Sequence, residues 1–170
     1  MGHTTLLKWV LKSGILGESI LGESVKVRAM RLDQLHTMQI TFREICEGRR
    51  PWTALGDFLN YWWVYAKDRR YDLVVDPILE APADEQYQQW AAYCAASVEH
   101  LCNKYNVPCP PWVHDSKYVL PMPWYCRPQE RVRQWLVSST PEEFRKRNIY
   151  SGDRMFLNKW ELAERYQDTA

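Results

Sequence analysis

Residues 107–128 restrict the fold more than any other part of this 170-residue chain. They contain six of its ten prolines, and also the large apolar residues Trp112, Val113, Tyr118, Val119, Leu120, Met122, Trp124 and Tyr125. Proline blocks a regular helix, and so many large apolar groups do not suit a solvated linker. The sequence therefore predicts an ordered, extended strap that lies across the helices of the domain.

Apolar residues recur three or four positions apart before the strap, a spacing typical of amphipathic helices. It predicts three helices, over residues 32–47, 51–70 and 84–105. Pro51 suits a first helical position, Asp84 can cap the third helix, and Gly48 can end the first. The apolar stripes, including Trp52, are expected in the core. His100 points away from its stripe and is expected in solvent.

Shorter elements are expected elsewhere. Helices are predicted over residues 131–137, after Thr140 and from Ser151, and Thr140 with Glu143 fits a capping box. The β-branched run 72–78 predicts an extended segment or an edge strand. The expected architecture is mainly α: a single-domain bundle of four or more helices over residues 31–170, with little or no β structure. Residues 1–30 are expected to be a mobile or loosely packed lead-in, because three internal glycines interrupt them.

The charges almost cancel, with 22 basic and 21 acidic side chains. This balance argues against a protein that wraps duplex nucleic acid by bulk electrostatics. Residues 127–154 nevertheless hold seven bases against four acids. Five cysteines without a CxxC pair favour a reducing, cytoplasmic location, and no apolar stretch approaches the roughly 20 residues of a membrane span.

The sequence contains no glycine-rich phosphate loop, no GxSxG and no HExxH, so no cofactor is expected. The residues that come nearest to a Cys3His zinc set are Cys102, Cys109, His114 and Cys126. Their spacings of 7, 5 and 12 match no zinc-knuckle pattern, and ordinary packing is the favoured interpretation.

Arg31 and His36 leave one enzymatic alternative open. Their Rx4H spacing resembles that of small helical ribonucleases of the HEPN class, in which the arginine supplies a cation and the histidine a general base for attack by a ribose 2′-hydroxyl. The chain departs from that pattern at Leu32, where the family usually has a polar residue. A small RNA-cleaving or nucleic-acid-binding protein is therefore the alternative function.

Two segments, 110–125 and 140–153, collect the Trp, Tyr and Arg side chains that are most enriched at binding hot spots. Proline or a helix cap stiffens both, so they lose little entropy on association. The candidate partner-binding residues are Trp112, Tyr118, Trp124, Tyr125, Arg145, Lys146, Arg147 and Asn148. The competing interpretation is that the aromatic residues only fasten the strap to the helices.

The same segments resemble an uncharacterised group of bacterial proteins with the pattern P-x-W-V-x-D-x-x-Y-x-L-x-x-P-W-Y/F, followed by T/S-P-x-x-F-R-x-R-N-I/V-F/Y. The matching residues here are Pro111-Trp112-Val113, Asp115, Tyr118, Leu120, Pro123-Trp124-Tyr125, Thr140-Pro141, Phe144-Arg145 and Arg147-Asn148-Ile149-Tyr150. Such proteins are often encoded beside nucleotidyltransferase-like genes of toxin–antitoxin type. The resemblance implies a regulatory or antitoxin-like subunit and supplies no active site.

The expected function is thus a non-enzymatic, intracellular protein-interaction module. A protein partner is favoured over nucleic acid, no membrane partner is expected, and a homo-oligomer is compatible with the sequence.

Overall fold

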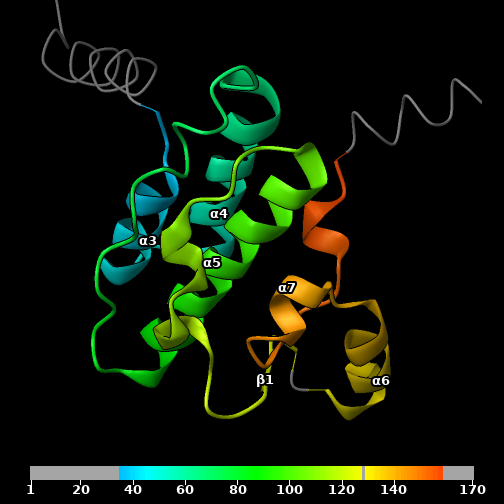
Figure 1. The fold of residues 1–170 in the computed structure, drawn as a ribbon. Helices are drawn as coiled ribbons and strands as arrows, with labels where there is room; N and C mark the ends of the chain where they lie inside the picture. Colours follow the sequence, from blue (N-terminus) through cyan, green and yellow to red (C-terminus); the bar gives the residue numbers. More distant parts are fainter. Residues whose placement is uncertain (1–34, 128, 159–170) are drawn as a thin grey trace, which may run out of the picture. The chain divides into compact units, whose positions relative to one another are not determined.

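The computed structural model describes residues 35–127 and 129–158, and this part of the chain is mainly helical (Figure 1). Its α-helices are α3 (Met38–Cys46), α4 (Pro51–Asn60), α5 (Glu85–Tyr105), α6 (Glu130–Ser139) and α7 (Glu142–Arg145). A π-helical turn, Tyr61–Tyr65, extends α4, and 3-10 turns span Pro111–His114, Ser116–Tyr118 and Arg154–Phe156. Within the described residues, β structure is limited to β1 (Trp124–Tyr125) and β2 (Ile149–Tyr150). The prediction of a mainly α fold with little β structure is confirmed.

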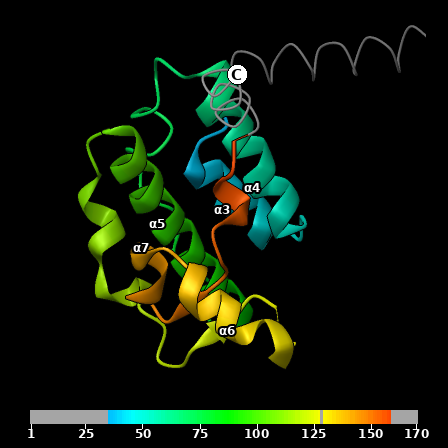
Figure 2. The same ribbon diagram turned by 90° about the vertical axis from the view of Figure 1, so that its right-hand side faces the viewer.

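Helix α5 is the centre around which the described elements pack. Every residue from Trp90 to Glu99 is buried, so neighbours cover this stretch on all sides. Helix α3 packs against both α4 and α5, while the 3-10 turns of the strap and α7 pack against α5 as well (Figures 1 and 2). The helix has the predicted bounds: the Asp84 side chain accepts a hydrogen bond from the Gln86 amide at 2.8 Å, and Asn106 ends it in the left-handed conformation.

The strap turns back at the end of α5 and runs along that helix, as Figure 1 shows. In the strap, the indole Nε1 of Trp112 donates a hydrogen bond to the Val74 carbonyl at 2.9 Å, and the next residue, Val113, is buried. The strap ends in β1, which pairs with β2 in parallel: the Trp124 amide donates to the Asn148 carbonyl at 2.8 Å. The strap is therefore ordered and largely extended, interrupted by two short 3-10 turns.

Two predicted elements differ from the structure. The helix predicted over residues 51–70 changes to a π-turn after Asn60 and ends at Tyr65. Residues 72–78 form no strand; the amides of Leu73 and Val74 donate to carbonyls three residues earlier, and both side chains are buried. Local turn bonds satisfy these amides, so the β-branched run does not need a strand partner.

Thr140 does not form the predicted capping box. The residue before α7 is Pro141, and no side chain caps the helix. The Thr140 hydroxyl instead donates to the Leu136 carbonyl and accepts from the amides of Ser151 (3.1 Å) and Gly152 (2.8 Å). Thr140 thus holds the end of α6 against the chain that follows β2. The helix predicted from Ser151 is only the 3-10 turn, and its further residues lie outside the described part.

We expect Gly152→Ala to lower the free energy of unfolding by about 1–3 kcal/mol. Gly152 has φ +71°, and an added Cβ would lie 2.6 Å from the Trp135 ring. Urea denaturation measures the change. Gly56→Ala is the matched control, because a Cβ at that position of α4 meets nothing within 4 Å and alanine favours a helix. An equal loss in both variants would contradict the proposed close approach.

Candidate interaction surface

Four aromatic rings from α4, α5 and β1 meet beside the N-terminal half of α5. Ring centroids are 4.9 Å apart for Trp52 and Trp90, 5.1 Å for Trp90 and Trp124, and 5.5 Å for Trp52 and Tyr93. The planes are close to perpendicular, the edge-to-face arrangement that aromatic pairs favour. Trp90 and Tyr93 are buried and form the floor; Trp52 extends from it toward solvent, and Trp124 is partly buried against it.

Trp52 is 47% exposed, so its predicted place in the core is wrong. It lies in the first turn of α4, where its ring packs edge-to-face with Trp90 and Tyr93 and the rest of it remains exposed. Met122, two residues before Trp124, is 71% exposed, and the prolines on either side of it are exposed too. We call Trp52, Trp124 and residues 121–123 the tryptophan surface. Large exposed apolar groups close together are typical of interaction sites.

The other aromatic candidates of the strap are buried or only partly exposed. Tyr118 is buried, and the Trp112 ring packs edge-to-face on it with centroids 5.8 Å apart. These two residues fasten the strap to the helices, as the competing interpretation predicted. Tyr125 is partly exposed and stacks on Tyr150.

Arg147 lies in the interior and is not available to a partner, contrary to its selection as a binding residue. It is 2% exposed, and its guanidinium donates to the Glu99 carboxylate at 2.5 Å and to the carbonyls of Glu143 and Val113 at 2.6 Å each. Lys146 also donates to Glu99. Arg147 therefore ties α5, α7 and the strap together.

Asn148 and Arg145 divide in the same way. Asn148 has φ +60° and donates from its side chain to the Leu120 carbonyl at 2.6 Å, so it fixes the strap. Arg145 is exposed and pairs with Glu142 at 2.7 Å. Of the three basic residues 145–147, Arg145 and Lys146 are exposed.

Glu99 and Glu143 are two acidic residues that the sequence patterns did not indicate as functional candidates; Glu143 was predicted only as part of a capping box. Burial alone would raise the pKa of Glu99, but hydrogen bonds from Lys146 and Arg147 outweigh it and hold the pKa below its ordinary value. Burial likewise opposes ionisation of Glu143. Hydrogen bonds, of which the one from Asn103 has the largest effect, outweigh burial and lower the pKa of Glu143. Their partners lie 40 or more residues away along the chain, and no local pattern reports such pairs.

His100 is not a free solvent-exposed side chain, and that expectation is wrong. Its Nδ1 lies 3.1 Å from a carboxylate oxygen of Glu143, and its ring packs on Phe156 with centroids 4.8 Å apart. The ring thereby covers the edge of the core, between α5 and the last described turn.

The four zinc candidates do not converge. Among the described residues no group of three or more Cys, His, Asp or Glu side chains is arranged to hold a metal ion. Cys102 and Cys109 contact each other, whereas the His114 ring turns to Glu99, with Nδ1 3.7 Å from its carboxylate. Burial raises the pKa of the thiols of Cys102 and Cys126 to about 12, so both are protonated at neutral pH. The three cysteines thus pack in or against the core, whereas His114 is exposed.

Of the HEPN-like pair, Arg31 lies outside the described residues and His36 directly precedes the Thr37 cap of α3. The Nε2 atom of His36 is buried without a hydrogen-bond partner and lies 3.7 Å from a Glu44 oxygen. Burial lowers the pKa of this imidazole. A base so enclosed has little access to a polymer substrate.

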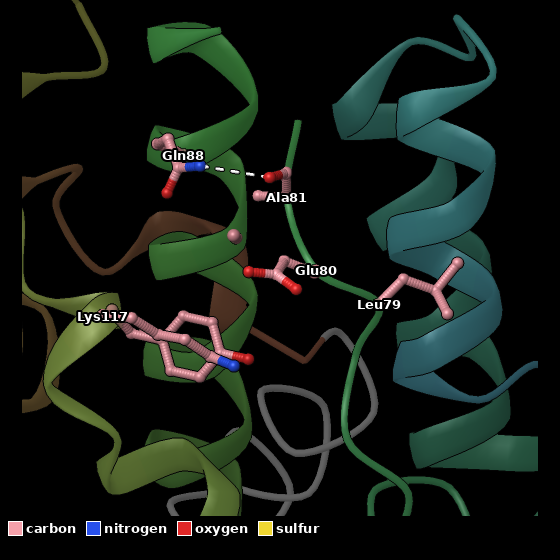
Figure 3. Close-up of a pocket in the computed structure, with 7 residues that line it drawn as sticks. Leu79, Glu80, Ala81, Gln88 and Lys117 are labelled. Carbon is pink, nitrogen blue, oxygen red and sulfur yellow. Dashed lines mark hydrogen bonds between the residues drawn. The ribbon is translucent and has the colours of Figure 1, made fainter. Parts of the chain in front are cut away.

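Figure 3 shows a small cavity between α5, the segment before it and the second 3-10 turn. It holds about 90 Å³ and is lined by Leu79, Glu80, Ala81, Gln88, Ala91, Lys117 and Tyr118. The Gln88 side chain donates to the Ala81 carbonyl at 3.2 Å and fixes that segment to α5. Ligand pockets usually hold about 300–1,000 Å³, so this cavity is too small for a substrate of ordinary size.

Comparison with known proteins returns no relative. The chain matches no protein-family model, no curated protein and no solved structure. Within the described residues, every helix is too short or too polar to cross a lipid bilayer.

Proposed function

We propose that this chain is a non-enzymatic protein-interaction subunit that binds its partner through the tryptophan surface. The observation that carries the proposal is the exposure of Trp52 and Met122 beside Trp124, on a floor of buried aromatic rings. Tryptophan is the residue type most enriched at hot spots, where an anchored aromatic side chain contributes much of the binding free energy.

The surface is stiff before it binds, which favours affinity. Edge-to-face contacts hold Trp52 and Trp124 against α5, and prolines at 121 and 123 restrict the backbone around Met122. Little conformational entropy remains to be lost on association.

The resemblance to bacterial proteins encoded beside nucleotidyltransferase-like genes supplies the kind of partner. Trp124 belongs to the P-W-Y part of that pattern and is also half of the tryptophan surface. We therefore propose an antitoxin-like subunit that docks on a nucleotidyltransferase-like protein. The five cysteines are all unpaired thiols, which supports a reducing compartment such as the cytoplasm.

The test is coexpression with the nucleotidyltransferase-like protein encoded nearest to this chain, followed by titration calorimetry of the purified pair. We expect a stable complex, and we expect Trp52→Ala to weaken its Kd about 30-fold, because hot-spot truncations cost about 2 kcal/mol or more. Met122→Ser, at an exposed turn, should weaken the complex without affecting the fold.

Tyr65→Ala is the matched control. It removes an aromatic group that is 67% exposed at the other end of the α4 helix and its π-turn, away from the tryptophan surface. Its Kd should remain that of the parent. A strictly monomeric chain that forms no complex, or equal weakening by Tyr65→Ala and Trp52→Ala, would refute the proposal.

A further inference from the structure

Helix α6 is held less tightly than the other described long helices. Of its ten residues only Leu136 is buried, and the helix lies at the periphery of the described part in both views (Figures 1 and 2). Arg131, Gln134 and Ser138, spaced three and four residues apart, are all exposed. The helix therefore presents to solvent a mainly polar face that carries Arg131.

A stack of planar groups lies between this helix and the two-stranded sheet. Trp124 and Ile149 are paired and face the core, so Tyr125 and its pair Tyr150 share the opposite face of the sheet. Their rings are nearly parallel, 16° apart, with centroids 4.9 Å apart. The Arg133 guanidinium of α6 lies 4.6 Å from the Tyr125 ring centroid, and both tyrosines are partly exposed.

A second stack of the same chemistry lies on α6. The Arg154 guanidinium is 5.0 Å from the centroid of the Trp135 ring, which is also partly exposed. Helix α6 thus supplies one member to each of two arginine–aromatic stacks, and such stacks provide planar surfaces on which a base can stack.

The chain segment that supplies most of these groups is rich in exposed bases. Among the described residues of 127–158, six bases are exposed (Arg127, Arg131, Arg133, Arg145, Lys146 and Arg154). Three acids are exposed in the same segment (Glu130, Glu142 and Asp153). Arg127 and Arg131 make no ion pair within the described part of the chain. Their positive charge is thus available to a phosphate backbone.

We propose that Tyr125, Tyr150 and the arginines of α6 form a binding site for single-stranded nucleic acid. Bases would extend the stacks, and Arg127 and Arg131 would neutralise phosphates. A single strand fits because its bases are free to stack on aromatic and guanidinium planes, whereas the near-zero net charge of the chain does not suit a wrapped duplex. The site lies on the opposite face of β1 from Trp124, so this inference is independent of the tryptophan surface.

The test is fluorescence anisotropy of labelled 12-nucleotide oligo-U RNA and oligo-dT DNA, titrated with the full chain at several salt concentrations. Binding should weaken steeply with salt. Arg127→Gln with Arg131→Gln should reduce the slope of log affinity against log salt by about 1.4, because each phosphate contact on a single strand contributes about 0.7. Tyr150→Leu should weaken binding about fivefold or more and leave that slope unchanged, since a stacked base is lost without a charge.

Matched controls are Arg69→Gln, which removes an exposed arginine paired with Asp72, and Tyr65→Leu, which removes an exposed tyrosine on the π-turn. Neither should change oligonucleotide affinity, and circular dichroism should show a native helix content for every variant. Tighter binding of RNA than of DNA would identify RNA as the ligand. Equal binding would show that the site recognises the bases and phosphates that both single strands share.

Three outcomes would overturn the proposal. The first is no oligonucleotide binding at low salt by the natural chain. The second is unchanged affinity in both the arginine double variant and Tyr150→Leu. The third is equally tight binding of poly-glutamate that Tyr150→Leu does not affect, which would assign the basic face to an acidic protein surface.

Discussion

Replacing Arg147 with leucine is expected to lower the free energy of unfolding by about 3–5 kcal/mol, the usual cost of removing one partner from a buried ion pair. The guanidinium of Arg147 donates to Glu99 and to the carbonyls of Val113 and Glu143. Its loss leaves two carbonyls without this donor, and the largely buried Glu99 carboxylate keeps Lys146 as its remaining strong partner. Urea denaturation followed by circular dichroism measures the change.

Arg145→Leu is the matched control, two residues away on the same turn. Arg145 is exposed and pairs with Glu142, and exposed pairs contribute about 0–1 kcal/mol. The double variant Glu99→Leu with Arg147→Leu should lose less stability than the sum of its single variants, because it leaves no buried unpaired charge: Lys146, which loses Glu99, is exposed. Equal losses for Arg145→Leu and Arg147→Leu would show that Arg147 does not hold the strap.

The acid dependence of stability offers a second readout of the same variant. Hydrogen bonds from Lys146 and Arg147 hold the pKa of Glu99 below its ordinary value despite burial. A carboxyl whose pKa is lower in the folded than in the unfolded state stabilises the fold above the unfolded pKa, and this contribution is lost as the pH falls through the folded pKa. Arg147→Leu removes one of the two donors, so the loss of stability below pH 5 should become shallower.

Much of the helical framework follows from local chemistry. Asp84 caps α5, Gly48 ends the helix turn after α3 with φ +93°, and Pro51 begins α4, all as predicted. Each of these residues acts on its own neighbours within a few positions. The strap was predictable for a similar reason, because proline excludes a helix wherever the segment is placed.

Thr140 and His100 are misplaced by the sequence pattern because their contacts come from distant segments. Thr140 has the local pattern of a helix cap, yet its hydroxyl serves amides eleven and twelve residues later. His100 lies on the polar side of α5 by periodicity, but α7 and the last described turn cover that side. Helical periodicity places a residue on one side of its own helix and does not show which neighbours cover the other sides.

The candidate site divides for the same reason. Hot spots and core junctions both use Trp, Tyr and Arg, so composition alone did not separate Tyr118 and Arg147, which are buried, from Tyr125 and Arg145, which reach solvent. Trp52 is the reverse case, since its spacing fits the core stripe of α4 although its first-turn position leaves it half exposed. Tertiary packing decides whether each of these residues belongs to the core or to the exposed surface.

Tyr93→Ala is expected to cost about 3–5 kcal/mol, the range for deleting a large buried aromatic side chain. Tyr93 is fully buried on α5, and its ring contacts Trp52 of α4, Trp124 of β1 and Phe144 of α7, with centroids 5.5, 6.1 and 5.0 Å away. Because four elements meet on this ring, the cavity left by alanine cannot be filled by moving one of them. Urea denaturation measures the loss.

Tyr93→Phe separates the ring from its hydroxyl. The hydroxyl lies 3.4 Å from the Met155 sulfur, a weak acceptor, so phenylalanine should cost less than about 1.5 kcal/mol. The same pair of variants examines the tryptophan surface, since Tyr93 is part of its floor. Tyr93→Phe should bind the partner as the natural chain does, whereas Tyr93→Ala should weaken the complex even where it remains folded. If the phenylalanine variant were as unstable as the alanine variant, the hydroxyl rather than the ring would join these four elements.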